Sequence, residues 1–488
     1  MRKAVVAALA VVVVAGAAVA AVPLIERHAA AEIKADIERG GVVTVGSVEV
    51  GLFDRRIAIT ALRTQRGEEI AVGRWQASGL AWPLAELARG RTPLAGVHFG
   101  DPLQARRVDV RDLRLVDAQG RWTIGSLSID DFRLERYEPL PVPAEVGPLA
   151  ARIAAALSLG RLEQKDSVFT EAASGTKASV GSLVLERFDK GQLGALTMAG
   201  FDFTDMPPHD PVFRLADFRI TDLDLRRVLK ATGTVGWRPG MPLGRIDIGS
   251  ASLSGFSGEA LARYGIELRS ITQQSQVEKD VRHSRLRIEG FVLDPPAKTR
   301  DGLQMRVVLQ AMGLKALKLD SDCLGTEDRA KGEVSVDRCA LTGPDLGELS
   351  LSLKLVGADA PFWQAIDDGN TFALLGSKAG IGGAKIVVVD RGLVERAVKA
   401  VATTSGQAPA AVRAQFAQEV RRFQPPGILI TEDLGKLLDT VARFVERGGT
   451  LTLEAKPDSP IGLDKAQYFV RPGPDLVNIL GLSATLSR

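Results

Sequence analysis

One recurring pattern restricts the fold of this chain more than any other feature: apolar-x-apolar-x-x-apolar-x-apolar. The stretch FRITDLDLR at 218–226 shows it, with polar residues between Phe218, Ile220, Leu223 and Leu225. Within each half the alternation has period two, which is typical of a strand with one face buried. Further copies are Val108, Val110, Leu113, Leu115; Leu127, Ile129, Phe132, Leu134; Leu196, Met198, Phe201, Phe203; and Leu286, Ile288, Phe291, Leu293, with partial copies Ile57, Ile59, Leu62 and Leu183, Leu185, Phe188.

The extra residue in the middle of this pattern needs a structural explanation. A one-residue offset would turn the second half of the strand to the opposite face of the sheet. A β-bulge restores the face and bends the strand, whereas the alternative is a tight bend into a new strand. Both predict a mainly β chain with an elongated, strongly curved, groove-like antiparallel sheet. An ordinary β-sandwich also explains much of the pattern, although aromatic residues make up only 5% of the chain.

A second block, apolar-Gly-Ser-x-x-apolar, recurs beside the first pattern. It occurs at 45–50, 124–129, 180–185 and 248–253. Its spacing is irregular, which argues against a strict solenoid repeat. Small residues such as Gly46 and Ser47 suit positions where a strand starts or the backbone turns sharply.

The N-terminus predicts a membrane anchor. A short basic start, Met1-Arg2-Lys3, precedes 22 residues without a charge, from Ala4 to Ile25. About 20 apolar residues cross a hydrocarbon core, and the positive-inside rule leaves the bulk of the chain outside the cytoplasm. The alternative is a signal peptide cleaved near Ala18-Val19-Ala20, but the run exceeds the usual h-region of about 7–15 residues. We expect a transmembrane signal-anchor at 1–25 and a juxtamembrane helix at 26–40.

The remainder divides into two predicted regions. Residues 41–380 form the repeated curved-sheet region, punctuated by short helices at 148–157 and 259–264. Residues 381–488 form a mixed α/β region with strands at 385–390 and 450–455 and helices at 391–402, 408–423, 431–447 and 475–480. Gly448-Gly449 ends the longest of these helices.

Charge and cysteine content narrow the function classes. The 62 Lys and Arg nearly balance the 59 Asp and Glu, which argues against a nucleic-acid binder. Cys323 and Cys339 are the two cysteines. Because an exported chain meets an oxidising compartment, we expect them to form a disulfide, which contributes roughly 3 kcal/mol in the chain-entropy account. Two unpaired buried thiols are the alternative.

The sequence predicts no catalytic, cofactor or metal site. None of His28, His98, His209 and His283 has the spacing of metal ligands. The S-x-x-K tetrapeptide at 174–177 lacks the motifs that accompany it in penicillin-binding enzymes, so we interpret it as a polar loop. The glycine-rich stretch at 380–385 lacks the spacing of a phosphate loop and is interpreted as a turn. Asp320 and Asp322 are interpreted as a solvated loop, and Arg-Asp interleaving at 105–114 as the wet face of a sheet or a weak contact with anionic lipid.

The anchor followed by VTVGSVEVGLFDRRIAITALR, SLSIDDFRL and FRITDLDLR resembles the AsmA-like proteins of Gram-negative envelopes. The resemblance covers the anchor and residues 42–350. It implies one inner-membrane anchor, a long β-groove in the periplasm, and a role in phospholipid transport and outer-membrane assembly. It implies no catalytic residues.

We therefore expect a non-enzymatic, membrane-anchored periplasmic protein that binds or transfers phospholipid, with other envelope proteins as further partners. A soluble periplasmic protein is the alternative if the signal is cleaved. The rival function is an envelope scaffold or a protein- or glycan-binding module with a closed β core. If lipid binds, the contacting residues are expected on the apolar strand faces: Leu127, Ile129, Phe132, Leu196, Phe201, Ile220 and Leu223.

Overall fold

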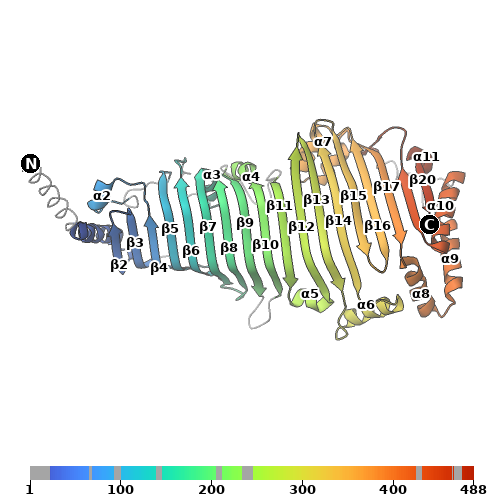
Figure 1. Cartoon of the computed structure of the whole chain (residues 1–488), viewed down its shortest axis with the longest axis horizontal. Coiled ribbons are helices and arrows are strands. Elements are labelled where there is room, and N and C mark those ends of the chain that lie inside the picture. The colour runs from blue at the N-terminus through green and yellow to red at the C-terminus, as the bar shows by residue number, and fades with distance from the viewer. Residues whose placement is uncertain are drawn as a thin grey trace, which may run out of the picture. The chain divides into compact units, whose positions relative to one another are not determined.

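The computed structural model describes residues 22–64, 69–92, 100–138, 146–204, 212–233, 246–424, 431–463, 465 and 475–487. Within these residues the fold is mainly β, and its twenty strands belong to an antiparallel sheet (Figure 1). The chain divides into two compact units. Unit 1 comprises residues 1–211 and 221–241, and unit 2 comprises residues 212–220 and 242–488.

Unit 1 begins with a helix over 22–38 that packs beside its first strands. Its elements are β1 (Val43–Thr44), β2 (Ser47–Gly51), β3 (Arg56–Thr64), β4 (Glu69–Ser78), α2 (Leu84–Ala88), β5 (Leu103–Val116), β6 (Gly120–Leu134), α3 (Val146–Ala156), β7 (Leu157–Glu171), β8 (Lys177–Asp189), β9 (Gln192–Thr204) and α4 (Arg226–Thr232). Strand β10 (Phe213–Asp224) is divided between the units.

Unit 2 continues the alternation of long strands and short helices. Its elements are β11 (Asp247–Ser257), α5 (Glu259–Tyr264), β12 (Ile266–Glu278), β13 (Val281–Leu293), α6 (Arg300–Ala311), β14 (Leu317–Asp328), β15 (Glu333–Gly343), β16 (Gly347–Val356), α7 (Ala360–Asp367), η1 (Thr371–Gly376), β17 (Gly380–Asp390), α8 (Leu393–Ser405), α9 (Pro409–Arg421), α10 (Glu432–Arg447), β18 (Thr450–Ala455), β19 (Ile461–Gly462), α11 (Leu476–Ile479) and β20 (Leu482–Ser487).

Each copy of the split apolar pattern contains a residue with a left-handed backbone just before its second half. Its φ is +53° at Asp112, +54° at Asp131, and +67° at both Gly200 and Gly290, and aspartate and glycine are among the residues that tolerate this conformation. Among these four copies, only the one at Gly290 shows the register shift that a bulge produces, between Ile288 and Phe291 against β14. The register of β5 with β6, of β6 with β7 and of β8 with β9 is constant, so the predicted bulge is wrong for the other three.

The recurrent glycines are the other half of the same contact. A Cβ atom on Gly73 of β4 would lie 2.9 Å from Cβ of Asp112, and one on Gly125 of β6 would lie 3.0 Å from Cβ of Asp166 in β7. A side chain at either position would collide with the left-handed residue of the neighbouring strand. For Gly46 the predicted place at a strand start is confirmed, but Gly125 lies in the middle of its strand, because there the left-handed Asp166 needs a bare backbone opposite it.

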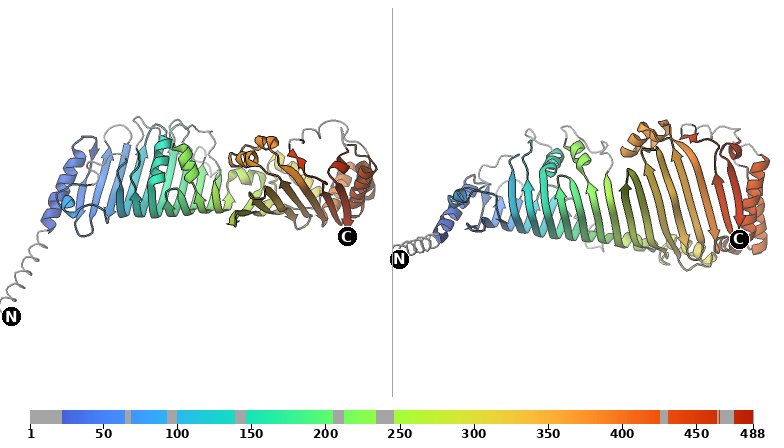
Figure 2. Two further views of the ribbon diagram at one scale, coloured as in Figure 1. Left: turned by 90° about the horizontal axis from the view of Figure 1, so that it is seen from above. Right: turned by 45° about the horizontal axis from the view of Figure 1, so that its top comes forward.

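The expected strong curvature is absent. In each unit the strands form an open sheet that is neither strongly curled nor closed (Figure 2). A bulge bends a strand because it adds one unpaired residue. The described strand pairs from β2 to β9 keep a constant register across their left-handed residues, so the bend that bulges would add is absent there.

Two predictions concern the ends of the described chain. The structure contains no helix, among the residues it describes, that is long and apolar enough to cross a membrane. Residues 1–21, which carry most of the predicted anchor, lie outside the described residues. In the C-terminal region α8, α9, α10, β18 and α11 confirm the predicted order of elements. Strand β17 pairs with β16 across ten residue pairs, so this region extends the unit 2 sheet.

Candidate functional site

The main candidate site in unit 1 is one apolar face of its sheet. Rows of side chains cross this face from strand to strand, and each row contains one residue per strand. One row is Leu115, Trp122, Phe169, Ala178 and Phe203, each paired with the next. Its aromatic residues Trp122, Phe169 and Phe203 are 37–43% exposed. The face is therefore apolar and only half covered.

Five of the residues expected to contact lipid lie in these rows. Leu127 and Ile129 pair with β5, and Leu196 pairs with Leu185 of β8. Phe132 and Phe201 are half-buried on the same two strands. Ile129, Leu196 and Leu223 also pack against the buried cluster of Leu159, Phe188 and Leu193. Ile220 is half-buried in the part of β10 assigned to unit 2.

An apolar cavity of about 270 Å³ lies on unit 1. It is lined by Ile57, Trp75, Ala77, Leu80, Leu103, Ala105, Val108, Ile129 and Phe132. No charged or hydrogen-bonding side chain lines it apart from the indole of Trp75. Its size is close to the lower end of small-molecule pockets, about 300 Å³, so it can hold part of an apolar chain.

Two polar residues interrupt the apolar face on β7, and the sequence pattern did not reveal their role. Gln164 pairs with Leu127 and Leu183, and Ser167 pairs with Ile124 and Val180. The Ser167 hydroxyl accepts a hydrogen bond of 2.8 Å from the indole N–H of Trp122. Because an unpaired N–H costs free energy in an apolar setting, Ser167 allows the large indole to lie on this face.

Unit 2 has an apolar face of its own. One row contains Leu286, Cys323, Cys339, Leu351, Ile386 and Leu453, each paired with the next. Leu351 is 42% exposed and Ile386 37%. The structure records a disulfide between the directly paired Cys323 and Cys339. The disulfide therefore belongs to the apolar row and joins β14 to β15 in its middle.

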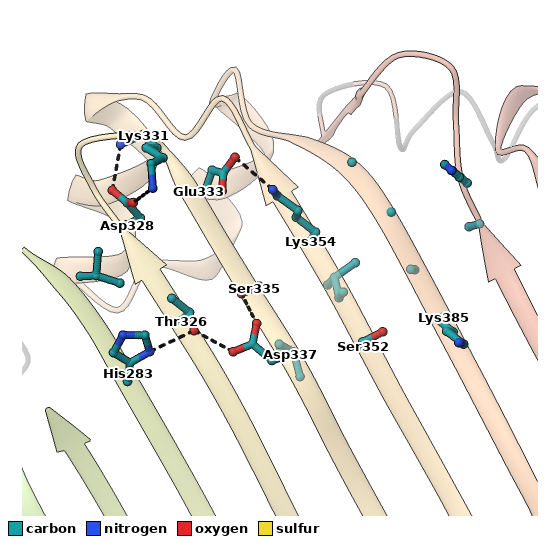
Figure 3. A pocket seen from close by; sticks show the side chains of 18 of the residues that line it. His283, Thr326, Asp328, Lys331, Glu333, Ser335, Asp337, Ser352, Lys354 and Lys385 are labelled. Atoms are coloured by element: carbon teal, nitrogen blue, oxygen red, sulfur yellow. Dashed lines mark hydrogen bonds and ion pairs between the residues drawn. The ribbon is translucent and has the colours of Figure 1, made fainter. Parts of the chain in front are cut away.

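A polar depression of about 840 Å³ also lies on unit 2 (Figure 3). Its centre is a hydrogen-bond network on β13, β14 and β15. The carboxylate of Asp337 accepts hydrogen bonds from the hydroxyls of Thr326 at 2.7 Å and Ser335 at 2.6 Å. The His283 ring nitrogen Nδ1 lies 3.4 Å from the Thr326 hydroxyl.

Two ion pairs lie around this depression. Lys331 contacts Asp328 at 2.8 Å and Lys354 contacts Glu333 at 3.0 Å. The Lys331 ammonium, followed by its backbone N–H, holds the pKa of Asp328 below its usual value. Lys385 has no ion pair among the described residues. The arrangement offers hydroxyl, carboxylate and ammonium groups suited to hydrogen-bonding a polar ligand.

The other candidate residues of the sequence do not form a site in the described residues. His28 is exposed on the helix 22–38, whereas His98 and His209 lie outside the described residues. The Ser174 hydroxyl forms hydrogen bonds with Glu171 and Thr176 in the turn before β8, and within the described residues it forms none with Lys177. The described residues contain no cluster of three or more potential metal ligands.

Two stretches that were expected to be a turn and a loop are strands in the structure. The stretch 380–385 was expected to be a turn, but it opens β17, where Gly382 leaves room for the side chain of Val356 on β16. Asp320 and Asp322 were expected in a loop but lie on β14. Asp322 accepts two hydrogen bonds from Arg285, at 2.8 and 2.5 Å, so its carboxylate is engaged in a cross-strand ion pair.

Comparison with known proteins gives one match. A family model described as "Uncharacterized protein" matches residues 340–486, from β15 to β20. No curated protein matches the chain significantly. Residues 340–486 are thus similar to a protein family whose description names no activity.

Proposed function

We propose that this chain binds phospholipid acyl chains on the apolar faces of its sheets, as a membrane-anchored periplasmic protein of the AsmA-like kind. The observation that carries the proposal is the rows of half-exposed apolar side chains on both units. Contiguous exposed apolar surface beyond a few hundred Å² is typical of a ligand or interaction site. Lipid binding would use these faces as open surfaces and would need no catalytic group.

The energetics favour an acyl chain as the occupant. Each methylene removed from water contributes about 0.8 kcal/mol. Because hydrophobic contacts are non-directional, an acyl chain can bind at many positions along a face made of successive rows. The polar faces of the same strands carry charged pairs such as Arg107 with Asp109 and Arg161 with Glu186, which keep the other side of the sheet in water. The proposal includes residues 1–25 as an inner-membrane anchor, with a cleaved signal as the alternative.

The test is lipid that co-purifies with the full chain from envelopes in mild detergent. Native mass spectrometry and lipid extraction should detect phospholipid on the wild-type protein. We expect Phe132→Asp to lose the part of it that unit 1 binds, because the carboxylate desolvates unfavourably on the apolar face. Arg133→Asp is the matched control, since Arg133 is the next residue of β6 and exposed on the opposite face. A folded wild-type chain that carries no more lipid than Phe132→Asp would rule the proposal out.

The polar depression on unit 2 favours a second candidate function, glycan binding by an envelope scaffold. Paired hydroxyl and carboxylate groups such as Thr326, Ser335 and Asp337 suit a ligand rich in hydroxyls. Binding of the wild-type chain to an array of envelope glycans, lost in Asp337→Asn, would support it. An array that retains neither protein would remove this candidate.

A further inference from the structure

The turn between β2 and β3 exposes a large aromatic side chain. Phe53 is 81% exposed, although its neighbour Leu52 is buried. A solitary exposed phenylalanine is unremarkable on a protein surface. The residues around Phe53 indicate whether it belongs to a binding site.

The turn is tied directly to the chain that follows the predicted anchor. The backbone N–H of Leu52 donates a 2.9 Å hydrogen bond to the Glu26 carboxylate. Glu26 is the first charged residue after the uncharged run 4–25. The helix 22–38 is itself fixed, because Ala29 and Ile33 are buried in the same cluster as Leu52. The hydrogen bond and the shared cluster therefore hold the β2–β3 turn next to Glu26.

Exposed apolar residues lie on the helix side of this hydrogen bond as well. Leu24 is 67% exposed and Ile25 38%. They lie within two residues of Glu26, and Phe53 lies next to Leu52. Exposed apolar side chains therefore lie on both segments that this hydrogen bond joins, the helix 22–38 and the β2–β3 turn.

The surroundings of Phe53 are basic. A hollow of about 480 Å³ beside it is lined by Arg55, Arg56 and Arg106, with Asp54 as its only acidic residue. Asp54 lies 3.2 Å from Arg56. Arg55 and Arg106 have no ion pair among the described residues, and both are exposed. Two guanidinium groups are thus left without a counter-charge from the protein.

We propose that Phe53, Arg55 and Arg106 form a contact site for the surface of an anionic bilayer. This inference rests on the proposed anchor, which brings residue 26 to the membrane surface. Phe53 would enter the interface, and each arginine near anionic headgroups strengthens the attraction to the membrane surface. Arginine donates several N–H bonds to phosphate oxygens, which suits it to lipid headgroups.

The contact site adjoins the apolar cavity. Leu80 lines both the basic hollow and the 270 Å³ cavity. A headgroup held by Arg55 or Arg106 would consequently lie at the entrance to an acyl-binding surface. The contact site therefore holds unit 1 at the bilayer in a position from which lipid can be taken up.

The test measures where position 53 lies when the full chain is in lipid nanodiscs. Phe53→Cys carries a nitroxide spin label, and Phe372→Cys is the matched control, because Phe372 in η1 is 85% exposed. In nanodiscs containing phosphatidylglycerol we expect the label at 53 to be relaxed by dissolved oxygen and shielded from a water-soluble nickel chelate. The label at 372 should remain accessible to the chelate.

Charge reversal identifies the role of the arginines. Arg55→Glu with Arg106→Glu should return the label at 53 to the accessibility found at 372, whereas Arg136→Glu, also exposed in unit 1, should leave it shielded. A label at 53 as accessible as that at 372 in the anionic nanodiscs would overturn the inference. Lipid that still co-purifies with the chain in that case would show that acyl binding by the sheet faces stands without the contact site.

Discussion

At the scale of single residues, the feature most open to test is the contact between a left-handed residue and the glycine that faces it on the next strand. Gly73→Val places a side chain against Asp112 and should destabilise the fold by about 1–3 kcal/mol, the usual cost of overpacking. Adding Asp112→Gly removes the colliding side chain and should restore most of this stability. Urea unfolding followed by tryptophan fluorescence, with Trp75 two residues from the site, measures both variants.

Gly435→Ala is the control for this pair. Gly435 lies inside α10 and has no neighbouring atom within 4 Å of its missing Cβ. Alanine is favoured over glycine in a helix by about 1 kcal/mol, so this variant should be neutral or more stable. If Gly73→Val and Gly435→Ala behave alike, the proposed collision does not exist.

The cross-strand pair of Arg285 and Asp322 predicts a dependence on pH. Hydrogen bonds from Arg285 lower the pKa of Asp322 in the folded chain, from an unfolded value of about 3.9. Its stabilisation is therefore present above about pH 4 and is lost as the pH falls through the lowered folded pKa. Because both side chains are more than a third exposed, we expect less than about 1 kcal/mol. Melting temperatures of Asp322→Asn and wild type should differ at pH 7 and converge toward pH 2; an equal difference at both pH values would contradict this.

At the scale of elements, the disulfide between β14 and β15 can be tested by substitution. Replacing Cys323 and Cys339 with serine should cost roughly 3 kcal/mol, since the closed loop constrains the unfolded chain. Calorimetry of the double variant measures the loss. Protein that is denatured without reductant and only then alkylated should take up no label, and two labels per chain would contradict the pairing.

Individual elements were predictable to the extent that local pattern determines them. The alternating strands, the α5 helix and the helices of the C-terminal region follow from alternation, capping residues and helix-ending glycines. Thr431, for example, accepts a hydrogen bond from the N–H of Leu434 as a helix cap. The strand at 380–385 was missed because its glycines are permitted by a neighbouring strand, a contact between residues about 25 apart in sequence.

At the scale of the whole molecule, each unit has its own apolar face, so lipid capacity should divide between them. Leu351→Asp on unit 2 should remove part of the bound phospholipid, Phe132→Asp on unit 1 another part, and the double variant nearly all. Ser350→Asp, on the next residue of β16, is the matched control. Lipid extraction and quantification per chain give the answer, and full loss from either single variant would show that the faces are not separate sites.

The candidate sites were only partly visible in the sequence. Leu127, Ile129 and Phe132 follow from periodicity, because their face is set by alternation within one strand. Arg55 and Arg106 could not be grouped in advance, since they meet only when the β2–β3 turn and β5 come together. The hydrogen bond from Trp122 to Ser167 of β7 could not be predicted either, because strand register cannot be deduced from one strand alone.

The pairing of a left-handed residue with a bare backbone has a consequence for how such a chain can change. Sliding one strand by two residues would preserve which face is apolar, yet it would drive the left-handed residue into a side chain. Each hairpin that contains this contact thus has its own means of fixing the register, independent of the turns and of distant strands. A hairpin duplicated or deleted together with this contact would still align with its neighbours, so the number of strands can vary without redesign of the rest.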